Sequence, residues 1–258
     1  KVVLDVGAGT GILSLFAAKC GARRVYAVEA SDIAGHTAEL VRENGFEDVI
    51  TVLQCRVEEC ELEEKVDVIV SEWMGFYLLH ESMLASVLFA RDKWLKPGGL
   101  VLPRFARLYC CPINMEAHCN ERFLFWTDVY GFSMQTFINA EAQSMLRAPV
   151  ITVVPAEALL SEPKLVTELD CTRIAAADLA YISSELEFSA TKEGICHGFC
   201  FWFDCEFEEG VALSTAPASA PTHWKQATVM LPEMLAATPG ARLDCKVNFQ
   251  QSQDNERQ

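Results

Sequence analysis

The chain has 258 residues, of which 51% are hydrophobic, 22% charged and 10% aromatic, a composition that supplies a globular core and argues against extensive disorder. With 21 basic and 36 acidic residues, the net charge is -15, which disfavours nucleic acid and anionic membranes as partners and favours basic protein segments. Acidity that serves only solubility is the alternative reading of the charge.

The first part of the chain alternates apolar runs with helical patterns. Apolar runs predict strands at residues 1–6, 25–28, 50–55, 66–72 and 100–102. Apolar residues at helical spacing predict helices at residues 12–20, about 31–44 and 82–95. Ser31 and Asp32 offer N-cap side chains, and Gly21, Gly45 and the sequence KPGG end the helices. Continuously apolar strands that alternate with helices predict a doubly wound parallel sheet, a Rossmann-like α/β fold.

From Arg104 onward the runs become short and aromatic, as in ARLYCCPI, ELEFSA and GFCFWFDCEF. These runs predict antiparallel strands of a sandwich or barrel, and residues 114–145 between them read as helical or loop-like. At about 100 to 200 residues per domain, the length agrees with two domains. We therefore expect a Rossmann-like domain at residues 1–103 and a β-domain at residues 104–258.

A glycine-rich turn follows the first predicted strand. Gly7, Gly9 and Gly11 let backbone approach a ligand at the carboxyl edge of the sheet, but Ile12 replaces the third glycine of a dinucleotide fingerprint. Asp5, just before the turn, disfavours a phosphate and suits an ammonium group. A ligand without phosphate is therefore expected, unless Asp5 is only a structural cap.

Further polar residues follow the next two strands. Glu29, followed by Ala30, ends the second strand, where a carboxylate can accept both hydroxyls of a ribose. Val57 and Glu58 follow the third strand, where an adenine edge is expected, although Glu58 alone reads equally well as a solvated charge. A nucleoside that carries an amino acid and a positive sulfur in place of phosphate is S-adenosylmethionine, and its demethylated product is S-adenosylhomocysteine.

The segment SEWMGFYLLHESM contains two acids, Glu72 and Glu81, among aromatic residues, leucines and methionines. Carboxylates in apolar surroundings need a cationic partner or a proton. This segment therefore predicts a site for a cation.

Eleven cysteines fall mostly inside hydrophobic segments, which favours a reducing compartment over a disulfide framework. Cys196 and Cys200 flank His197, but no second Cys/His pair follows at zinc-finger spacing, so we expect no metal site. Since no apolar run reaches about 18 residues, we expect no membrane-spanning helix.

The motifs VLDVGAGTGILS, VYAVEAS, VDVIVSEWMG, the double-glutamate segment, LKPGGLVLP and THWKQ resemble the protein arginine N-methyltransferases over almost the whole chain. The resemblance implies a cofactor domain followed by a β-barrel domain with a helical dimerisation arm at about 115–145. It also implies a homodimer. The implied substrates are arginine side chains of proteins, in histone tails or glycine/arginine-rich segments. A role as a transcriptional coregulator, in nucleus and cytoplasm, is also implied.

The same resemblance assigns roles to residues of the site. Glu72 and Glu81 would hold the substrate guanidinium as catalytic residues, and Glu72 would also contact the cofactor. His223 would be a catalytic residue that forms a hydrogen bond in the closing loop. Trp224 would shape the substrate entrance. Met83 would crowd the acceptor nitrogen, which implies monomethyl and asymmetric dimethyl products. The alternatives are local ion pairing for Glu72, a helix N-terminal acid for Glu81, and packing for the other three.

Two departures from the family pattern concern the ends of the chain. Helices that cover the cofactor, and in one member a Src-homology-3 domain, are expected before Lys1, and a further barrel strand is expected after residue 258. A weakly active module that binds arginine peptides is an alternative function. A small-molecule or nucleic-acid methyltransferase is a third, disfavoured by the acidity and by the lack of a base-methylating motif.

Overall fold

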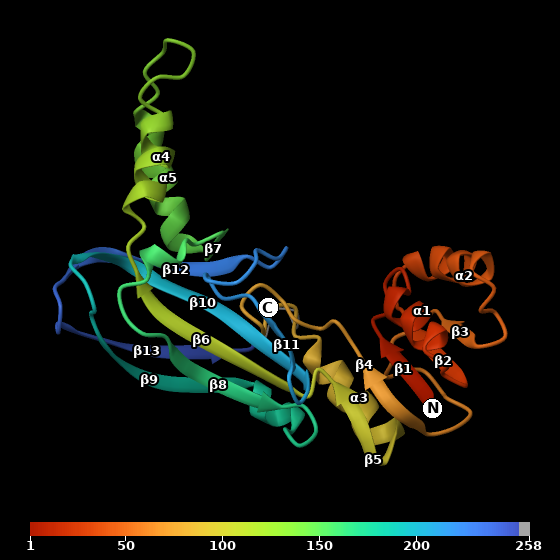
Figure 1. Ribbon diagram of the computed structural model, residues 1–258. Helices are drawn as coiled ribbons and strands as arrows, with labels where there is room; N and C mark the ends of the chain where they lie inside the picture. The colour runs from red at the N-terminus through yellow and green to blue at the C-terminus, as the bar shows by residue number, and fades with distance from the viewer. Residues whose placement is uncertain (253–258) are drawn as a thin grey trace.

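Five parallel strands form the first sheet in the computed structural model, which describes residues 1–252 (Figure 1). They are β1 (Val2–Val6), β2 (Arg24–Val28), β3 (Ile50–Leu53), β4 (Val66–Val70) and β5 (Leu95–Leu102), in the order β3-β2-β1-β4-β5. The connecting helices are α1 (Ile12–Lys19), α2 (Ile33–Glu43) and α3 (Leu84–Trp94). The strand order reverses beside β1, so the carboxyl ends of the strands flank a position where doubly wound sheets bind ligands. The predicted Rossmann-like fold is confirmed.

Burial explains why the apolar runs became strands. Every residue of β1 is buried, as expected for a central strand covered on both faces. Two local expectations were wrong. The last strand begins at Leu95, not at residue 100, because KPGG lies within β5 and its pairing with β4 shifts register between Val66 and Val68. Asp32 precedes α2 but its side chain makes no capping hydrogen bond.

The second half contains an antiparallel six-stranded sheet. Its main path has the order β7-β12-β10-β6-β8, and β11 pairs with β10. The strands are β6 (Phe105–Ile113), β7 (Val150–Thr152), β8 (Lys164–Asp170), β10 (Gly194–Glu208), β11 (Val211–Ser214) and β12 (Gln226–Ala237). Two short 3-10 helices, η1 (Ala156–Ala158) and η2 (Ala176–Leu179), connect parts of this sheet to its neighbours.

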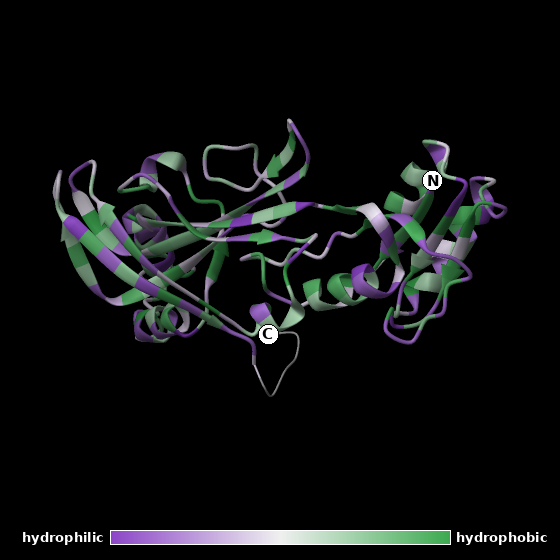
Figure 2. Cartoon of the chain, turned by 90° about the horizontal axis from the view of Figure 1, so that it is seen from below, coloured by the Kyte–Doolittle hydropathy of each residue, from purple (hydrophilic) through white to green (hydrophobic). Residues whose placement is uncertain are grey.

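A two-stranded sheet faces the larger one. β9 (Tyr181–Ser189) pairs with β13 (Arg242–Gln250), and hydrophobic and hydrophilic residues alternate along them (Figure 2). Their apolar face joins the buried core with Phe203 of β10 and Leu108 of β6. The two sheets together form the expected barrel domain. Within residues 1–252, β13 has a paired strand only on its β9 side.

Two helices project from the barrel as a pair (Figure 1). They are α4 (Glu116–Phe125) and α5 (Thr136–Arg147), and they occupy the segment where the arm was predicted. Apolar side chains near their outer end are exposed, with Tyr130 at 98%. The arm therefore presents an apolar surface away from the rest of the chain.

The two halves share one core and are bonded at α3. One buried cluster includes residues of both, such as Trp73 and Trp224. The Arg91 guanidinium donates hydrogen bonds to the carbonyl oxygens of Cys171, at 3.0 Å, and Ile174, at 2.8 Å, which follow β8. Among residues 1–252, no helix combines the length and apolarity required to cross a bilayer.

Candidate functional site

The glycine turn after β1 is shaped by contacts to its neighbours. Gly7, Gly9 and Gly11 have φ values of 72°, 55° and 83°, a region that L side chains rarely adopt. The backbone N–H of Gly7 donates to the carbonyl of Val28 at 2.9 Å. A Cβ at Gly11 would overlap the Thr37 methyl, so this glycine is needed for packing against α2.

Glu29 lies at the end of β2 and bonds to the turn. One carboxylate oxygen accepts from the backbone N–H of Gly9 at 2.9 Å, and the other accepts from Ser31 N–H at 2.8 Å. Burial raises the pKa of Glu29, but the hydrogen bonds from Ser31 and Gly9 outweigh it, so its pKa is below the ordinary value. Glu29 is therefore an anchored, charged acceptor at the cleft.

Asp5 lies behind the turn, not on the wall of the cleft. Its side chain is 1% exposed and accepts a hydrogen bond from the Ser14 hydroxyl at 2.7 Å. Burial raises the pKa of Asp5 to about 6, and its Oδ1 has no hydrogen-bond partner among the described residues. The predicted direct contact with a ligand ammonium is not made by a side chain in this position, because it points toward α1. The hydrogen bond from Ser14 thus connects Asp5 of β1 to α1, the helix that follows the turn.

A cleft of about 1030 Å³ opens at the carboxyl ends of these strands. Of the predicted cofactor residues, those on its wall are Gly7, Glu29, Ala30, Val57 and Glu58, and it extends to Glu81 and Met83. Gly9 and Gly11 do not line the cleft. Gly9 donates its N–H to the cleft residue Glu29, and Gly11 packs against Thr37 of α2. The Ser86 hydroxyl of α3 donates to Glu58 at 2.6 Å, so this carboxylate is held by a helix and is not merely solvated.

Sequence reasoning missed several residues of this cleft. They are Ser31, Cys55, Arg56, Ser82, Ala85, Ser86, Ala180, Gln250, Gln251 and Ser252. Ser31 and Arg56 each stand next to a predicted cleft residue, so strand-end position was an available signal. No signal pointed to Gln250 or Ala180, because they reach the cleft only through the packing of the barrel against the first domain.

The double-glutamate loop, residues 71–83, connects β4 to α3 and folds back on itself. Gly75 and Leu78 exchange backbone hydrogen bonds, at 3.1 and 2.9 Å, and Leu78 is fully buried. Leu78, Glu81 and Ser82 have φ values of 70°, 77° and 52°. Such values in residues other than glycine cost about 1 kcal/mol or more each and are typical of functional sites. The turn thus places Glu81 in a strained conformation that its surroundings must maintain.

The two acids of the loop, Glu72 and Glu81, are exposed, whereas the two residues that follow Glu72, Trp73 and Met74, are buried. The expectation of apolar surroundings was therefore wrong for much of each side chain. The protein around the Glu72 carboxyl nevertheless raises its pKa by desolvation, and the charge of Glu81 raises it further.

No lysine, arginine or histidine among residues 1–252 forms an ion pair with Glu72 or Glu81, although thirteen other ion pairs are present. The alternative that Glu72 pairs with a nearby lysine is therefore excluded within residues 1–252. Two coupled carboxylates without a counterion favour binding of an external cation.

Met83 lies over the glycine turn. A Cβ at Gly7 would overlap the Met83 methyl group, so the two residues are in close contact. Met83 lines both the cleft and a second cavity of about 520 Å³ inside the barrel. It therefore borders both spaces at the point where the double-glutamate loop meets α3.

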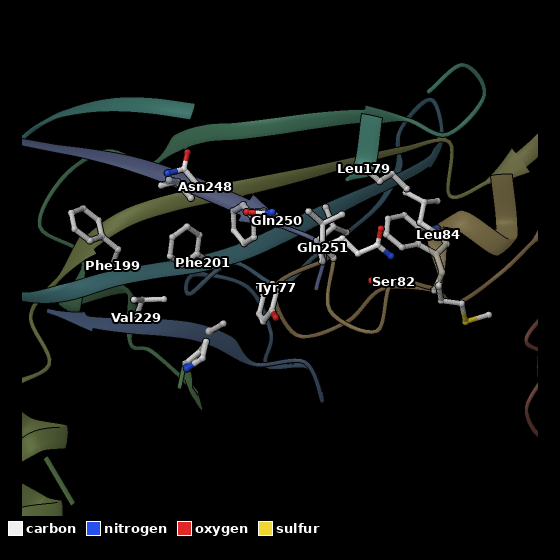
Figure 3. A pocket seen from close by; sticks show the side chains of 18 of the residues that line it. Tyr77, Ser82, Leu84, Leu179, Phe199, Phe201, Val229, Asn248, Gln250 and Gln251 are labelled. Atoms are coloured by element: carbon white, nitrogen blue, oxygen red, sulfur yellow. The ribbon is translucent and has the colours of Figure 1, made fainter. Parts of the chain in front are cut away.

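The barrel cavity is apolar and lies beside the double-glutamate loop. Figure 3 shows its wall, with Phe199 and Phe201 of β10 on one side, Tyr77 of the loop nearby, and Asn248 and Gln250 of β13 opposite. Gln250 lines the cleft as well. The loop is thus flanked by a polar cleft and an apolar cavity.

His223 and Trp224 occupy different positions. His223 is exposed and its ring centroid lies 3.8 Å from that of Trp224. Trp224 is 8% exposed, packs edge-on against Phe203, and donates its indole N–H to the Met74 carbonyl at 2.8 Å. The indole of Trp224 thus lies in the core and bonds to the double-glutamate loop, and its role in shaping the substrate entrance stays a prediction.

No metal centre is found in the described region. Residues 1–252 contain no group of three or more His, Cys, Asp or Glu side chains placed to hold a metal ion. His197 instead lies with its Nδ1 3.2 Å from the backbone N–H of Met115, which donates to it. All eleven cysteines are free thiols.

Comparisons with known proteins identify both halves. Residues 3–99 match the family described as a methyltransferase domain, and residues 104–258 match the arginine methyltransferase oligomerization subdomain. A probable protein arginine N-methyltransferase 6.2 from Oryza sativa subsp. indica is 42% identical, with 100% of this chain and 73% of that protein covered. The human protein arginine N-methyltransferase 2 is also 42% identical, with 93% of this chain and 57% of that protein covered.

A solved structure shows the same architecture. The PRMT1 enzyme-prozyme heterotetrameric complex of Trypanosoma brucei, solved with AdoHcy, has a TM-score of 0.88 and 40% sequence identity, covering 100% of this chain and 81% of that chain. The segments ITV, EKVDV, SEWMG, LSEP and HGF resemble protein arginine N-methyltransferase 2, and LLHESML also resembles the sixth protein of that series. Equal identities of 42% to relatives with either name do not separate these two.

Proposed function

This chain belongs to the protein arginine N-methyltransferase family, and from that premise we propose that it methylates guanidino nitrogens of arginine in basic protein segments, using S-adenosylmethionine. The double-glutamate loop carries the proposal. It presents two carboxylates that repel one another, beside a cleft at the switch point of the sheet, without a cation of the described chain between them. A guanidinium is planar, permanently charged and matched to such a pair.

The cleft fits the cofactor in chemistry. Glu29 is charged and already oriented by two backbone N–H groups, and Gly7 leaves the turn open to close approach. Val57 and Glu58 would lie at the base, with Ser86 fixing Glu58. When bound, S-adenosylmethionine supplies a methyl group on a positively charged sulfur, and its product is S-adenosylhomocysteine. The acidic walls suit a cationic nucleoside better than a phosphate-bearing one.

The carboxylates have two tasks. Glu72 and Glu81 hold the guanidinium by charge-assisted hydrogen bonds and orient one terminal nitrogen toward the cleft. They also concentrate positive charge on the opposite nitrogen, which leaves the oriented one more nucleophilic. A guanidinium with a pKa above about 12 is not deprotonated beforehand by a carboxylate, so its proton leaves late. The raised pKa of Glu72 makes its carboxylate a stronger acceptor for that proton than an ordinary glutamate.

The finer assignments follow from neighbouring residues. Met83, packed over Gly7 at the edge of the cleft, supports crowding of the acceptor nitrogen and hence monomethyl and asymmetric dimethyl products. The net charge of -15 supports basic substrates such as histone tails or glycine/arginine-rich segments. His223 is exposed beside the loop partner Trp224, consistent with a hydrogen bond to incoming substrate.

Assembly and location are also part of the proposal. The exposed apolar end of the α4–α5 arm supports docking on the cofactor domain of a second subunit in a homodimer, in keeping with the oligomerization subdomain that the second half matches. Eleven free thiols support a reducing location, nucleus and cytoplasm. A transcriptional coregulator role would then rest on methylation of basic nuclear proteins.

The test is incubation of the chain with methyl-labelled S-adenosylmethionine and an arginine-rich peptide, followed by mass spectrometry of the arginine products. Monomethylarginine and asymmetric dimethylarginine are the expected products. The Glu72→Gln variant should lose most of the transfer of label to the peptide. If the wild-type chain binds the peptide but transfers no label to it, the result would instead favour the non-catalytic module that binds arginine peptides. Symmetric dimethylarginine would contradict the role given to Met83.

A further inference from the structure

Trp224 joins the barrel to the double-glutamate loop across 150 positions of sequence, through the indole hydrogen bond to the Met74 carbonyl at 2.8 Å. Its ring lies 5.5 Å from that of Phe203 at an interplanar angle of 78°, so β10 fixes the orientation of the indole. Among barrel residues 104–250, no other side chain donates a hydrogen bond to residues 72–82. The contact is therefore the polar attachment of this loop to the second domain.

The loop requires such an attachment. Leu78, Glu81 and Ser82 are held at positive φ, a conformation that relaxes unless surrounding contacts prevent it. Contacts inside the loop, such as the Tyr77 hydroxyl with His80 Nδ1 at 3.1 Å, connect its outer part. These internal contacts do not connect the backbone that follows Glu72 to residues outside the loop. Met74, two residues after Glu72, receives that outside bond from Trp224.

We propose that Trp224 is a positioning residue, which holds the Met74 carbonyl and thereby sets the placement of the Glu72 carboxylate relative to Glu81. Trp73 and Met74 are buried, so this backbone has little room to move independently. A displacement of the Met74 carbonyl would therefore also displace Glu72. The inference rests on the proposed function for its catalytic consequence, but not for its conformational one. It gives the buried tryptophan a role distinct from contact with substrate.

Two substitutions separate the hydrogen bond from packing. Trp224→Phe removes the N–H and keeps an aromatic ring. Trp94→Phe is the matched control, because Trp94 is also 8% exposed and its Nε1 has no partner in the described residues. Should Trp224→Phe fail to fold, site-specific replacement of Trp224 by 3-benzothienylalanine keeps the shape of the indole and removes only the donor.

The first readout is hydrogen exchange of residues 72–83 in the cofactor-free chain. The Trp224 variant should exchange at least about 10-fold faster there, whereas Trp94→Phe should match the wild type. The second readout is steady-state kinetics. The Trp224 variant should lose about 10- to 100-fold in kcat with an unchanged KM for S-adenosylmethionine, as expected for misplaced catalytic groups. In a Glu72→Gln background it should cause little further loss.

The outcomes distinguish the two proposals. Unchanged exchange in the Trp224 variant overturns the positioning role, whatever the activity. Faster exchange with unchanged kcat also overturns it, because the loop placement would then be irrelevant to the reaction. Faster exchange in a chain whose wild type transfers no methyl group supports the positioning role and overturns the proposed function.

Discussion

The two halves of the molecule contribute to the site in different ways. In the first half, cleft residues stand at the ends of neighbouring strands, as Gly7 follows β1 and Glu29 follows β2. In the second half, individual side chains reach the loop: Trp224 donates a hydrogen bond to the Met74 carbonyl, and the Phe249 ring lies 6.0 Å from that of Tyr77. Strand ends are placed by the whole sheet, whereas the loop depends on a few individual contacts. Substitutions should therefore affect the loop more sharply than the cleft.

The largest expected effect is that of Glu72→Gln. The amide keeps the shape of the side chain but removes the charge that holds and polarises a guanidinium, so kcat should fall by about 10²- to 10³-fold. The measurement is label transfer to an arginine-rich peptide. Glu47→Gln, at an exposed position after α2, is the control and should leave kcat unchanged. An active Glu72→Gln variant would remove the loop from the chemistry.

Gly75→Ala tests how strictly the loop is constrained. A Cβ at Gly75 would overlap backbone of His80, so the turn must open, and we expect the free energy of unfolding to fall by about 3 to 4 kcal/mol. Gly35→Ala, within α2 and free of close contacts, is the contrast and should raise it by up to about 1 kcal/mol. Urea denaturation measures both, and equal effects would contradict the strained loop.

Asp5→Asn tests whether this buried carboxyl makes the stability of the first half depend on pH. Because the folded-state pKa is raised to about 6 from an ordinary 3.8, the folded protein retains a proton that the unfolded chain has released, and stability falls as pH rises between these values. Asp5→Asn lacks this titration, so relative to wild type it should gain up to about 3 kcal/mol of unfolding free energy from pH 4 to pH 7. Asp48→Asn, at an exposed site, is the control and should show no such gain.

Arg91→Met tests the bond between the halves. The substitution leaves the Cys171 and Ile174 carbonyls without their donor, and the free energy of unfolding should fall by about 2 kcal/mol. Arg42→Met, on the exposed side of α2, should change it by less than about 0.5 kcal/mol. Thermal unfolding of both variants makes the comparison. Similar effects would mean that the guanidinium does not stabilise the interface.

Sequence reasoning located the first half well because its signals are local. The continuous burial of β1 and the glycine turn can be read from neighbouring residues, and the positions of Glu29 and Glu58 at the cleft follow from strand ends. Asp5 was misplaced because the side on which a strand residue points depends on the helix that packs there. β5 was misjudged because KPGG reads as a break and yet pairs with β4.

The loop and the barrel were predictable only in part. The double-glutamate motif indicated a cation site, but its positive φ values and exposed carboxylates result from tertiary contacts. The burial of Trp224 depends on Phe203 and Met74, which are far away in sequence. The same holds for Gln250, which reaches the cleft by way of β13.

Among residues 1–252, β13 is paired on one side only, and its ion pairs with β9 bear on what an approaching strand would meet there. Unpaired N–H and C=O groups along a strand invite another chain to add to the sheet and begin aggregation. Arg242, Asp244 and Lys246 alternate along this strand, and both basic side chains form ion pairs with β9. These ion pairs place charged neighbours beside any strand that approaches this edge of the described sheet, and removing them would leave the edge more apolar.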